Sequence, residues 1–282
     1  KMNDKVTIIF VSFYSEKKIL QYLKHLDNNF KVIVIDNAND NSLNEKLQKF
    51  SNLQIIVNKE NIGFGAATNQ GLNNVETKYA LHLDIDSKIE IDSINKMVEE
   101  ADKINEFAIL GPLIVNHTYK EENYIKKNYE KYYNLMNFLE GCCLFFNMNE
   151  MKEIGFFDEN IFLYFEEVDL IKRCLKQSKR IIMIDNITIE HEGRSSVDEK
   201  FNVEIEINRN WHYMWSKFYY HKKHFSYLYA FFKIIRHIIS GFFKFIFYSL
   251  SRNNNKKSVY KARLSGCINA VLLKKSWYRP KI

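Results

Sequence analysis

A series of short apolar runs, separated by amphipathic stretches, constrains the fold of this chain most strongly. Lys5–Ser12 reads K-V-T-I-I-F-V-S, and such a continuous β-branched run is typical of a strand buried on both faces. The other strand-like runs are Phe30–Asp36, Leu53–Val57, Tyr79–Leu83, Ala108–Pro112, Phe138–Phe146, Arg180–Ile184 and Ile187–Glu190. Helical patterns fall between them, at Ile19–Leu26, Leu43–Phe50, from Ala66, at Asp92–Ile104 and at Leu170–Leu175. This alternation predicts an α/β fold with a doubly wound, mostly parallel sheet and helices on both faces.

Polar residues gather where the predicted strands end. Asp36 closes the second run, a glycine-containing loop follows the third, and Asp84 and Asp86 follow the fourth. Ligands of open α/β sheets bind beyond the carboxyl ends of the strands. The sequence therefore predicts a binding site along this edge of the sheet.

Asp84 and Asp86 stand one residue apart directly after Tyr79–Leu83. Residues two apart on an extended chain point to the same side, so the two carboxylates should lie together. A hard divalent cation, Mg²⁺ or Mn²⁺, would relieve their repulsion and would bridge to the phosphates of a substrate. The alternative interpretation is that both aspartates cap the helix that follows.

The loop after the third run, Asn61–Gly71, reads N-I-G-F-G-A-A-T-N-Q-G. Gly63 and Gly65 would let the backbone approach a ligand closely, and the following helix would offer free N–H groups to an anion. The loop matches neither the phosphate-binding G-x-x-x-x-G-K-[ST] motif nor the full G-x-G-x-x-G motif. As a bare glycine loop it is a weak signal, because such loops more often make no contact with a ligand.

Three acidic residues, Glu166, Glu167 and Asp169, follow the aromatic stretch Ile161–Phe165 at the start of a predicted helix. The helix macrodipole alone can explain acids at this position. Neighbouring aromatic rings would also desolvate a carboxylate and raise its pKa towards that of a general base. His191 follows the last strand-like run, which would bring it to the same edge as the aspartates, although a single histidine is more often structural.

Composition indicates one large core and the cellular compartment. The 282 residues are 46% hydrophobic, which suffices for a sizeable core with an appended unit. The four cysteines, Cys142, Cys143, Cys174 and Cys267, show no C-x-x-C spacing, so we expect reduced thiols in the cytosol. The chain opens on polar residues and continues directly into a strand, so we expect no signal peptide.

The formal net charge of +7 is unevenly divided along the chain. Residues 1–200 carry 25 Lys and Arg against 32 Asp and Glu, whereas residues 201–282 carry 16 Lys and Arg against two Glu. A basic C-terminal part indicates an anionic partner. Its density of Phe and Ile favours an anionic membrane surface over nucleic acid.

The most apolar part of this C-terminal region is His224–Leu250. On the expected helix one polar stripe is formed by Lys233, Arg236, His237, Ser240 and Lys244. The opposite face, expected to enter the membrane, contains Phe231, Phe232, Ile235, Ile238, Ile239 and Phe242. The charges of the polar stripe argue against a spanning helix and favour a helix lying in the membrane interface. The alternatives are a helix packed on the catalytic domain or on the partner in a homodimer. We expect a catalytic domain over residues 1–220 and a basic, amphipathic, membrane-associated region over residues 221–282, with a turn at 253–257 and a second helix at 262–273.

Six motifs in a fixed order run from the second strand onwards. They are V-I-V-I-D-N-A-N-D at 32–40, N-I-G-F-G-A-A-T-N-Q-G at 61–71, L-D-I-D at 83–86, E-G-C-C-L-F-F-N through F-L-Y-F-E-E-V-D-L at 140–170, H-E-G-R-S-S at 191–196 and N-R-N-W-H-Y-M-W-S-K-F-Y at 208–219. With these motifs the chain resembles family 2 of the inverting, nucleotide-sugar-dependent glycosyltransferases, which have the GT-A fold. It is most similar to their rhamnosyltransferase-like bacterial branch, and the resemblance covers roughly residues 5–220.

The resemblance implies a role for each polar residue at the strand ends. Asp36 would hold the base of a nucleoside diphosphate, and the nucleotide pocket would be lined by Ser12, Phe13, Asn61, Gly63, Gly65 and Asn69. Asp86 would ligate the metal, with Asp84 assisting near the ribose and His191 completing the coordination. Glu166 or Glu167 would deprotonate the acceptor. Two departures leave alternatives open. The family usually has Glu-Asp where this chain has Glu166-Glu167, and it commonly has Asn where this chain has Tyr14, a position that bears on the donor.

We therefore expect a metal-dependent inverting glycosyltransferase, a peripheral protein on the cytoplasmic side of the plasma membrane. It would move a sugar from a dTDP- or UDP-linked donor to a glycan or lipid-linked acceptor in cell-surface polysaccharide or glycoconjugate synthesis. One alternative is a nucleotidyltransferase, which would need a basic signature near the first strand that V-S-F-Y-S-E lacks. Another is a non-catalytic membrane-surface scaffold, which the intact set of acidic residues and His191 argues against.

Overall fold

The computed structural model describes residues 2–26, 29–104, 106–193 and 201–280, and these residues form two compact units. The larger unit holds the described residues up to Ile62, together with Ala66–Phe157 and the described residues from Glu167 to Gly193. The smaller unit holds Gly63–Gly65, Asp158–Glu166 and the described residues from Phe201 onwards. Two short loop segments of the first part of the chain thus belong, by their contacts, to the C-terminal unit.

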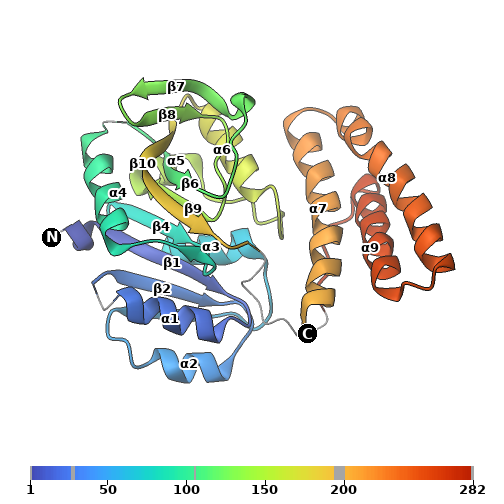
Figure 1. The fold of residues 1–282 in the computed structure, drawn as a ribbon, viewed down its shortest axis with the longest axis horizontal. Coiled ribbons are helices and arrows are strands. Elements are labelled where there is room, and N and C mark those ends of the chain that lie inside the picture. The colour runs from blue at the N-terminus through green and yellow to red at the C-terminus, as the bar shows by residue number, and fades with distance from the viewer. Residues whose placement is uncertain (1, 27–28, 105, 194–200, 281–282) are drawn as a thin grey trace. The chain divides into compact units, whose positions relative to one another are not determined.

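A mixed sheet with the strand order β3-β2-β1-β4-β9-β6-β10-β8-β7 forms the centre of the larger unit (Figure 1). Its strands are β1 Val6–Ser12, β2 Lys31–Asp36, β3 Leu53–Val57, β4 Tyr79–Leu83, β6 Ile109–Ile114, β7 Tyr124–Glu130, β8 Tyr133–Met136, β9 Cys143–Asn147 and β10 Ile181–His191, and the short β5 Ser87–Lys88 pairs with β10. The first four strands are parallel to one another, as are β6 and β10. Antiparallel β9 separates the two parallel groups.

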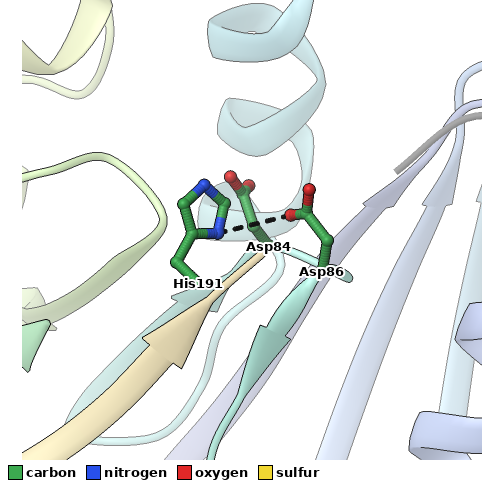
Figure 2. Close-up of side chains that lie close together, drawn as sticks. All are labelled: Asp84, Asp86 and His191. Carbon is green, nitrogen blue, oxygen red and sulfur yellow. Dashed lines mark ion pairs between the residues drawn. The ribbon is translucent and has the colours of Figure 1, made fainter. Parts of the chain in front are cut away.

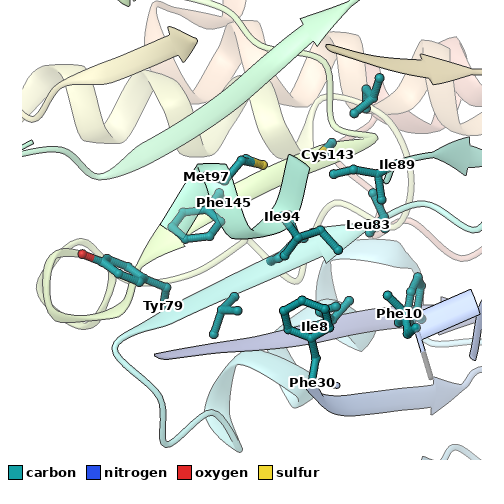
Figure 3. Close-up of a cluster of buried hydrophobic side chains, with 14 of the residues drawn as sticks. Ile8, Phe10, Phe30, Tyr79, Leu83, Ile89, Ile94, Met97, Cys143 and Phe145 are labelled. Carbon is teal, nitrogen blue, oxygen red and sulfur yellow. The ribbon is translucent and has the colours of Figure 1, made fainter. Parts of the chain in front are cut away.

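Helices cover both faces of this sheet, as the sequence predicted. They are α1 Glu16–Leu26, α2 Asn41–Leu47, α3 Phe64–Asn73, α4 Ile91–Lys103, α5 Met148–Ile154 and α6 Glu166–Lys176, with 3₁₀ turns at Met2–Lys5 and Glu121–Asn123. Alternate strand residues serve the two faces. Ile8 and Phe10 lie in the core cluster shared with α1, α2 and α4 (Figure 3), whereas Ile9 lies in the cluster shared with α3, α5 and α6.

Three of the predicted strand runs differ clearly in extent from the observed strands. β9 begins only at Cys143, because the preceding residues form an irregular segment in which Leu139 packs beneath Gly111. The two runs predicted at 180–184 and 187–190 are one strand, β10, whose pairing with β6 shifts register between Ile184 and Thr188. A bulge of this kind interrupts the alternation of apolar residues, so the sequence pattern predicts two strands where the structure has one.

Strand register places the ends of the first three strands at one level of the sheet. Ser12 lies opposite Asp36, and Asp36 lies opposite Val57. The Asn37 N–H donates to the Ser12 carbonyl, which continues the alignment past the end of β2. The predicted convergence of these strand ends along one edge is therefore confirmed.

The smaller unit is built mainly from α7 Asn202–His224, α8 Tyr227–Leu250 and α9 Asn254–Val271. Its core contains Trp211 and Phe218 of α7, Ile234 of α8 and Cys267 of α9. α7 has no counterpart among the predicted elements. Its buried positions include His212, Ser216 and Asn208 beside the apolar residues, so they give no clear amphipathic stripe in the sequence.

The helix boundaries of the C-terminal region differ from the predicted ones. The single helix expected over His224–Leu250 starts only at Tyr227, because the side chain of Ser226 caps the Tyr229 N–H. The turn expected at 253–257 is the start of α9, where the side chain of Asn253 caps the Lys256 N–H. The expected domain boundary at residue 220 lies inside α7, and the division into a catalytic and a membrane-associated region stays a prediction.

Among the described residues, no helix combines the length and the apolar content that crossing a membrane requires.

Candidate metal and nucleotide-sugar site

Asp84, Asp86 and His191 lie together at the carboxyl edge of the sheet, as Figure 2 shows. One potential ligand atom from each residue lies within 4.8 Å of those of the other two. The Nδ1 atom of His191 is 3.5 Å from the Oδ1 atom of Asp86. The juxtaposition predicted from the sequence is thus confirmed, whereas the coordination of a metal stays a prediction.

Backbone pairing brings these three residues together across a long sequence separation. The Asp84 N–H donates to the Cys142 carbonyl at 2.8 Å, which extends the pairing of β4 with β9 by one residue. β5 then pairs antiparallel with the end of β10, so that Ser87 lies opposite His191. The Glu192 N–H donates to the Asp86 carbonyl at 3.0 Å and closes the same ladder.

Two further side chains orient the cluster, and sequence reasoning missed both. His82 is completely buried, and its Nε2 atom lies 3.2 Å from the Oδ1 atom of Asp84. The Ser87 hydroxyl lies 3.2 Å from the Nδ1 atom of His191. The signal for His82 was present, because it stands two residues before Asp84 on an extended chain and shares its side. Hydrogen-bond partners of this kind commonly fix the orientation of metal ligands.

The chemistry of this cluster fits a divalent cation. Asp86 is only 5% exposed, and the carboxylate of Asp84 is close by and about one-third exposed. Two carboxylates and an imidazole are donors that suit Mn²⁺, and the two carboxylates also suit Mg²⁺. Asp84, Asp86 and His191 are therefore the residues that would hold such an ion.

Glu167 lies close to the same cluster. A Cβ atom placed on Gly141 would lie 3.6–3.7 Å from the side-chain carbons of Glu167, so this glycine is in contact with the glutamate. Burial raises the pKa of Glu167 to about 7, and the nearby carboxylates of Glu140 and Asp84 contribute to the rise. A carboxylate with a pKa near neutrality is suited to accept a proton as a general base.

The neighbouring acids have other surroundings. By its contacts Glu166 belongs to the smaller unit, where it is buried, whereas Glu167 belongs to the larger unit. Asp169 is fully buried and accepts a hydrogen bond from the Nε atom of Arg173 at 2.9 Å. Arg173 also donates to the carbonyls of residues 154–156, so Asp169 has a structural role.

The rings of the aromatic stretch before these acids pack on α7, and the wall that they were expected to form beside the base stays a prediction. Phe162 stacks on His212 with ring centroids 4.3 Å apart, and Phe165 contacts Tyr213 and Tyr220. Tyr164 and Phe165 also have positive φ angles of 66° and 71°. Such angles are strained for aromatic residues, and strain of this kind clusters at functional sites.

The residues expected to bind the nucleotide are mostly engaged in local contacts. The carboxylate of Asp36 is buried and accepts hydrogen bonds from Ala38 N–H, Asp40 N–H and the Asn44 side chain. Asn69 is also buried, and it exchanges two hydrogen bonds of 2.9 Å with the backbone of Phe157. These bonds give both residues a structural function, and their contact with a nucleotide stays a prediction.

The glycine loop is shaped by packing within the smaller unit. Gly63 has a φ of +95°, and a Cβ atom there would lie 2.6 Å from the carbonyl oxygen of Phe162. Gly65 is buried in the first turn of α3. The side chain of Asn61 accepts a hydrogen bond of 3.0 Å from Asn37, a buried residue that sequence reasoning did not select.

The end of β1 borders this part of the edge. Ser12 is fully buried, and the backbone of Phe13 is held by the Ser15 hydroxyl, which donates to its carbonyl at 2.9 Å. A pocket of about 300 Å³ borders the Asp84–Asp86–His191 cluster on the side of Asp86, between α1 and β5. Its lining includes Lys18 and Lys88, which sequence reasoning also missed.

The sheet, its two helical layers and the acidic cluster at the strand ends define a GT-A type of α/β protein. The chain belongs to glycosyl transferase family 2, because the model of that family matches residues 7–157. The resemblance expected from the sequence motifs is thereby confirmed.

Three curated relatives illustrate this family membership. The chain is 24% identical to glycosyltransferase GlyA of Streptococcus pneumoniae over 62% of its own length, but spans only 30% of that protein. It is 21% identical to the low-salt glycan biosynthesis hexosyltransferase Agl10 of Haloferax volcanii, with 64% of each chain covered. It is 23% identical to the dTDP-rhamnosyl transferase RfbF of Shigella flexneri, with 67% of this chain and 70% of that protein covered.

Solved structures share the fold at low sequence identity. The mannosyltransferase PcManGT from Pyrobaculum calidifontis, in complex with GDP-Man and Mn²⁺, matches with a TM-score of 0.59 and 12% identity over 96% of this chain and 88% of its own. TarS 1–349 of S. aureus, in complex with UDP-GlcNAc, matches with a TM-score of 0.54 and 15% identity over 98% and 93%. The GT-A fold is therefore established for this chain.

Proposed function

We propose that this chain transfers a sugar from a nucleoside-diphosphate donor to a hydroxyl group of a glycan or lipid-linked acceptor, with a divalent metal and with inversion at the anomeric carbon. One observation carries the proposal. The Asp84–Asp86–His191 cluster and the side chain of Glu167, which contacts Gly141, lie close together at the carboxyl edge of the sheet. A family 2 chain with these groups has both parts that a single displacement needs.

The division of labour follows from the chemistry of each group. A bound divalent cation would neutralise the charge of the departing diphosphate. Asp84, Asp86 and His191 would hold such an ion, with Asp84 oriented by His82 and His191 by Ser87. Glu167 accepts the proton of the acceptor hydroxyl while that oxygen bonds to the anomeric carbon and the bond to the diphosphate breaks. One displacement on the face opposite the leaving group inverts the configuration.

The relatives support the chemical class of the donor. RfbF is named as a dTDP-rhamnosyl transferase, and TarS was crystallised with UDP-GlcNAc. PcManGT was solved in complex with GDP-Man and Mn²⁺. A structure of GalNAc-T7, which matches this chain with a TM-score of 0.55 and 12% identity, contains UDP, GalNAc and Mn²⁺. This similarity supports our proposal of a nucleoside-diphosphate sugar, dTDP- or UDP-linked, as the donor and of Mn²⁺ or Mg²⁺ as the metal. Synthesis of a cell-surface glycan at the cytoplasmic face of the membrane is part of the same proposal.

A nucleotide-release assay over a panel of dTDP- and UDP-sugars, with and without Mn²⁺, tests this function. Wild-type protein should release nucleotide from at least one donor, and EDTA should abolish the release. Asp86→Ala should lose release by at least about 100-fold, because it removes a buried metal ligand that supports charge stabilisation.

Asp92→Ala is the matched control, because Asp92 is an exposed aspartate at the start of α4. It should keep wild-type release. Full turnover in EDTA, or equal loss in both variants, would contradict the assigned metal role.

A further inference from the structure

α8 carries a long apolar stripe that the smaller unit leaves uncovered. The stripe consists of Leu228, Phe232, Ile239, Phe243, Ile246 and Leu250, which recur at intervals of three, four and seven residues. Their side chains are between 40% and 80% exposed. Six large side chains along a helix of 24 residues form an unusually extended exposed apolar surface for a globular protein.

The opposite side of α8 makes the packing contacts. Ala230, Ile234 and Gly241 are buried, and they follow the stripe with an offset of two residues, or about 200° around the helix. A Cβ atom on Gly241 would lie 3.2 Å from Leu264 of α9, so the two helices approach closely here. Phe231 and Ile238, expected on the membrane-facing side, pack instead against the core of the smaller unit. One side of α8 therefore packs against the smaller unit, and another side presents an exposed apolar face.

Basic residues lie between these two sides. Lys233, Arg236 and Lys244 are exposed and occupy one flank of the apolar stripe. Lys233 and Lys244 lie over the rings of Tyr229 and Tyr260, with the ammonium nitrogens 5.0 and 5.3 Å from the ring centroids. An apolar face with cationic residues along its flank is the arrangement of a helix that lies in the interface of an anionic bilayer.

We infer that α8 docks this chain on an anionic membrane through the apolar stripe, with Lys233, Arg236 and Lys244 at the level of the lipid headgroups. Charge selects this occupant over a second copy of the chain. Residues 201–282 carry 16 Lys and Arg against two Glu, so two copies facing each other through α8 would bring like charges together. Anionic headgroups would instead neutralise them. The inference rests on α8 alone and does not depend on the transfer reaction.

Co-sedimentation of the full chain with vesicles tests this docking. Wild-type protein should sediment with phosphatidylglycerol vesicles. Replacing Lys233, Arg236 and Lys244 with Gln should weaken this binding by roughly 100-fold, since each cationic residue near the surface contributes about a factor of five. The double variant Phe232→Glu/Phe243→Glu should be released from phosphatidylglycerol vesicles altogether, because it opposes insertion of the stripe.

The full chain is the appropriate material, because a protein ending near Tyr220 would expose the packed face of α7, including Phe218. Ile125→Glu is the matched control. Ile125 is 56% exposed on β7 in the other unit, and its variant should bind vesicles like the wild type. Phe232 and Phe243 are 70% and 65% exposed, so their variant should retain the wild-type melting temperature.

Two results would overturn the inference. One is that the double variant sediments as well as the wild type. The other is that light scattering shows a wild-type dimer that the double variant converts to a monomer, which would assign the stripe to a second copy.

Discussion

At the scale of single residues, the site depends on environments that the sequence only partly reveals. The spacing of Asp84 and Asp86 on an extended chain predicted their proximity, and the position of His191 after a strand predicted its edge of the sheet. The choice between Glu166 and Glu167 could not be made in this way. It depends on the contact of Gly141 with Glu167 and on the assignment of the two glutamates to different units.

Glu167→Gln should lower the rate of sugar transfer by about 10²–10⁴-fold, the usual contribution of a general base. Binding of the nucleoside diphosphate should be unchanged, because the glutamine is isosteric and the base acts on the acceptor. Glu166→Gln is the paired comparison and should retain most of the rate. Single-turnover rates and equilibrium nucleotide binding of both variants measure this, and near-normal transfer by Glu167→Gln would place the base elsewhere.

The same residue sets a pH dependence with a defined sign. The carboxyl of Glu167 has a pKa raised to about 7, and it accepts a proton only when ionised. The transfer rate of wild type should therefore fall about tenfold per pH unit as the pH drops below 7. A profile that stays flat down to pH 5 would contradict this assignment of the base.

At the scale of elements, the periodicity of apolar residues predicted the helices that bury one face and the strands that bury one face or both. It failed where another constraint decides the structure. The bulge in β10 breaks the alternation of one strand, and the caps at Ser226 and Asn253 decide where α8 and α9 begin. The helix α7 was not predicted, because buried polar residues such as His212 interrupt its apolar pattern. His212 can be buried because its ring nitrogens have polar partners, 2.9 Å from the Tyr278 carbonyl oxygen and 3.1 Å from the Ser276 hydroxyl.

The glycine loop gives a prediction at this scale. Gly63→Ala should destabilise the protein by about 1–3 kcal/mol, because the residue has positive φ and its new methyl group would collide with the Phe162 carbonyl. Gly141→Ala is the comparison for stability, since its methyl group would meet only ordinary contacts with Glu167. Urea unfolding measures both. If Gly63→Ala lost nucleotide affinity at full stability, the loop would serve the ligand rather than the packing.

At the scale of the whole molecule, the division of charge distinguishes residues 201–282 from the rest of the sequence. It does not indicate which other segments of the chain belong to the same unit as these residues. Contacts assign Gly63–Gly65 and Asp158–Glu166 to the same unit as α7, α8 and α9. Such assignments depend on long-range packing, for example the stacking of Phe162 on His212, and local patterns carry no trace of them.

Binding of Mn²⁺, followed by electron paramagnetic resonance, tests the central claim most directly. The claim is that Asp84, Asp86 and His191 form a metal site for a nucleoside-diphosphate donor. In the presence of UDP or dTDP, the wild-type chain should remove one equivalent of Mn²⁺ from the free-ion signal, and Glu167→Gln should do the same. Asp86→Ala should leave the free-ion signal unchanged. Equal Mn²⁺ binding by Asp86→Ala and wild type would contradict the account.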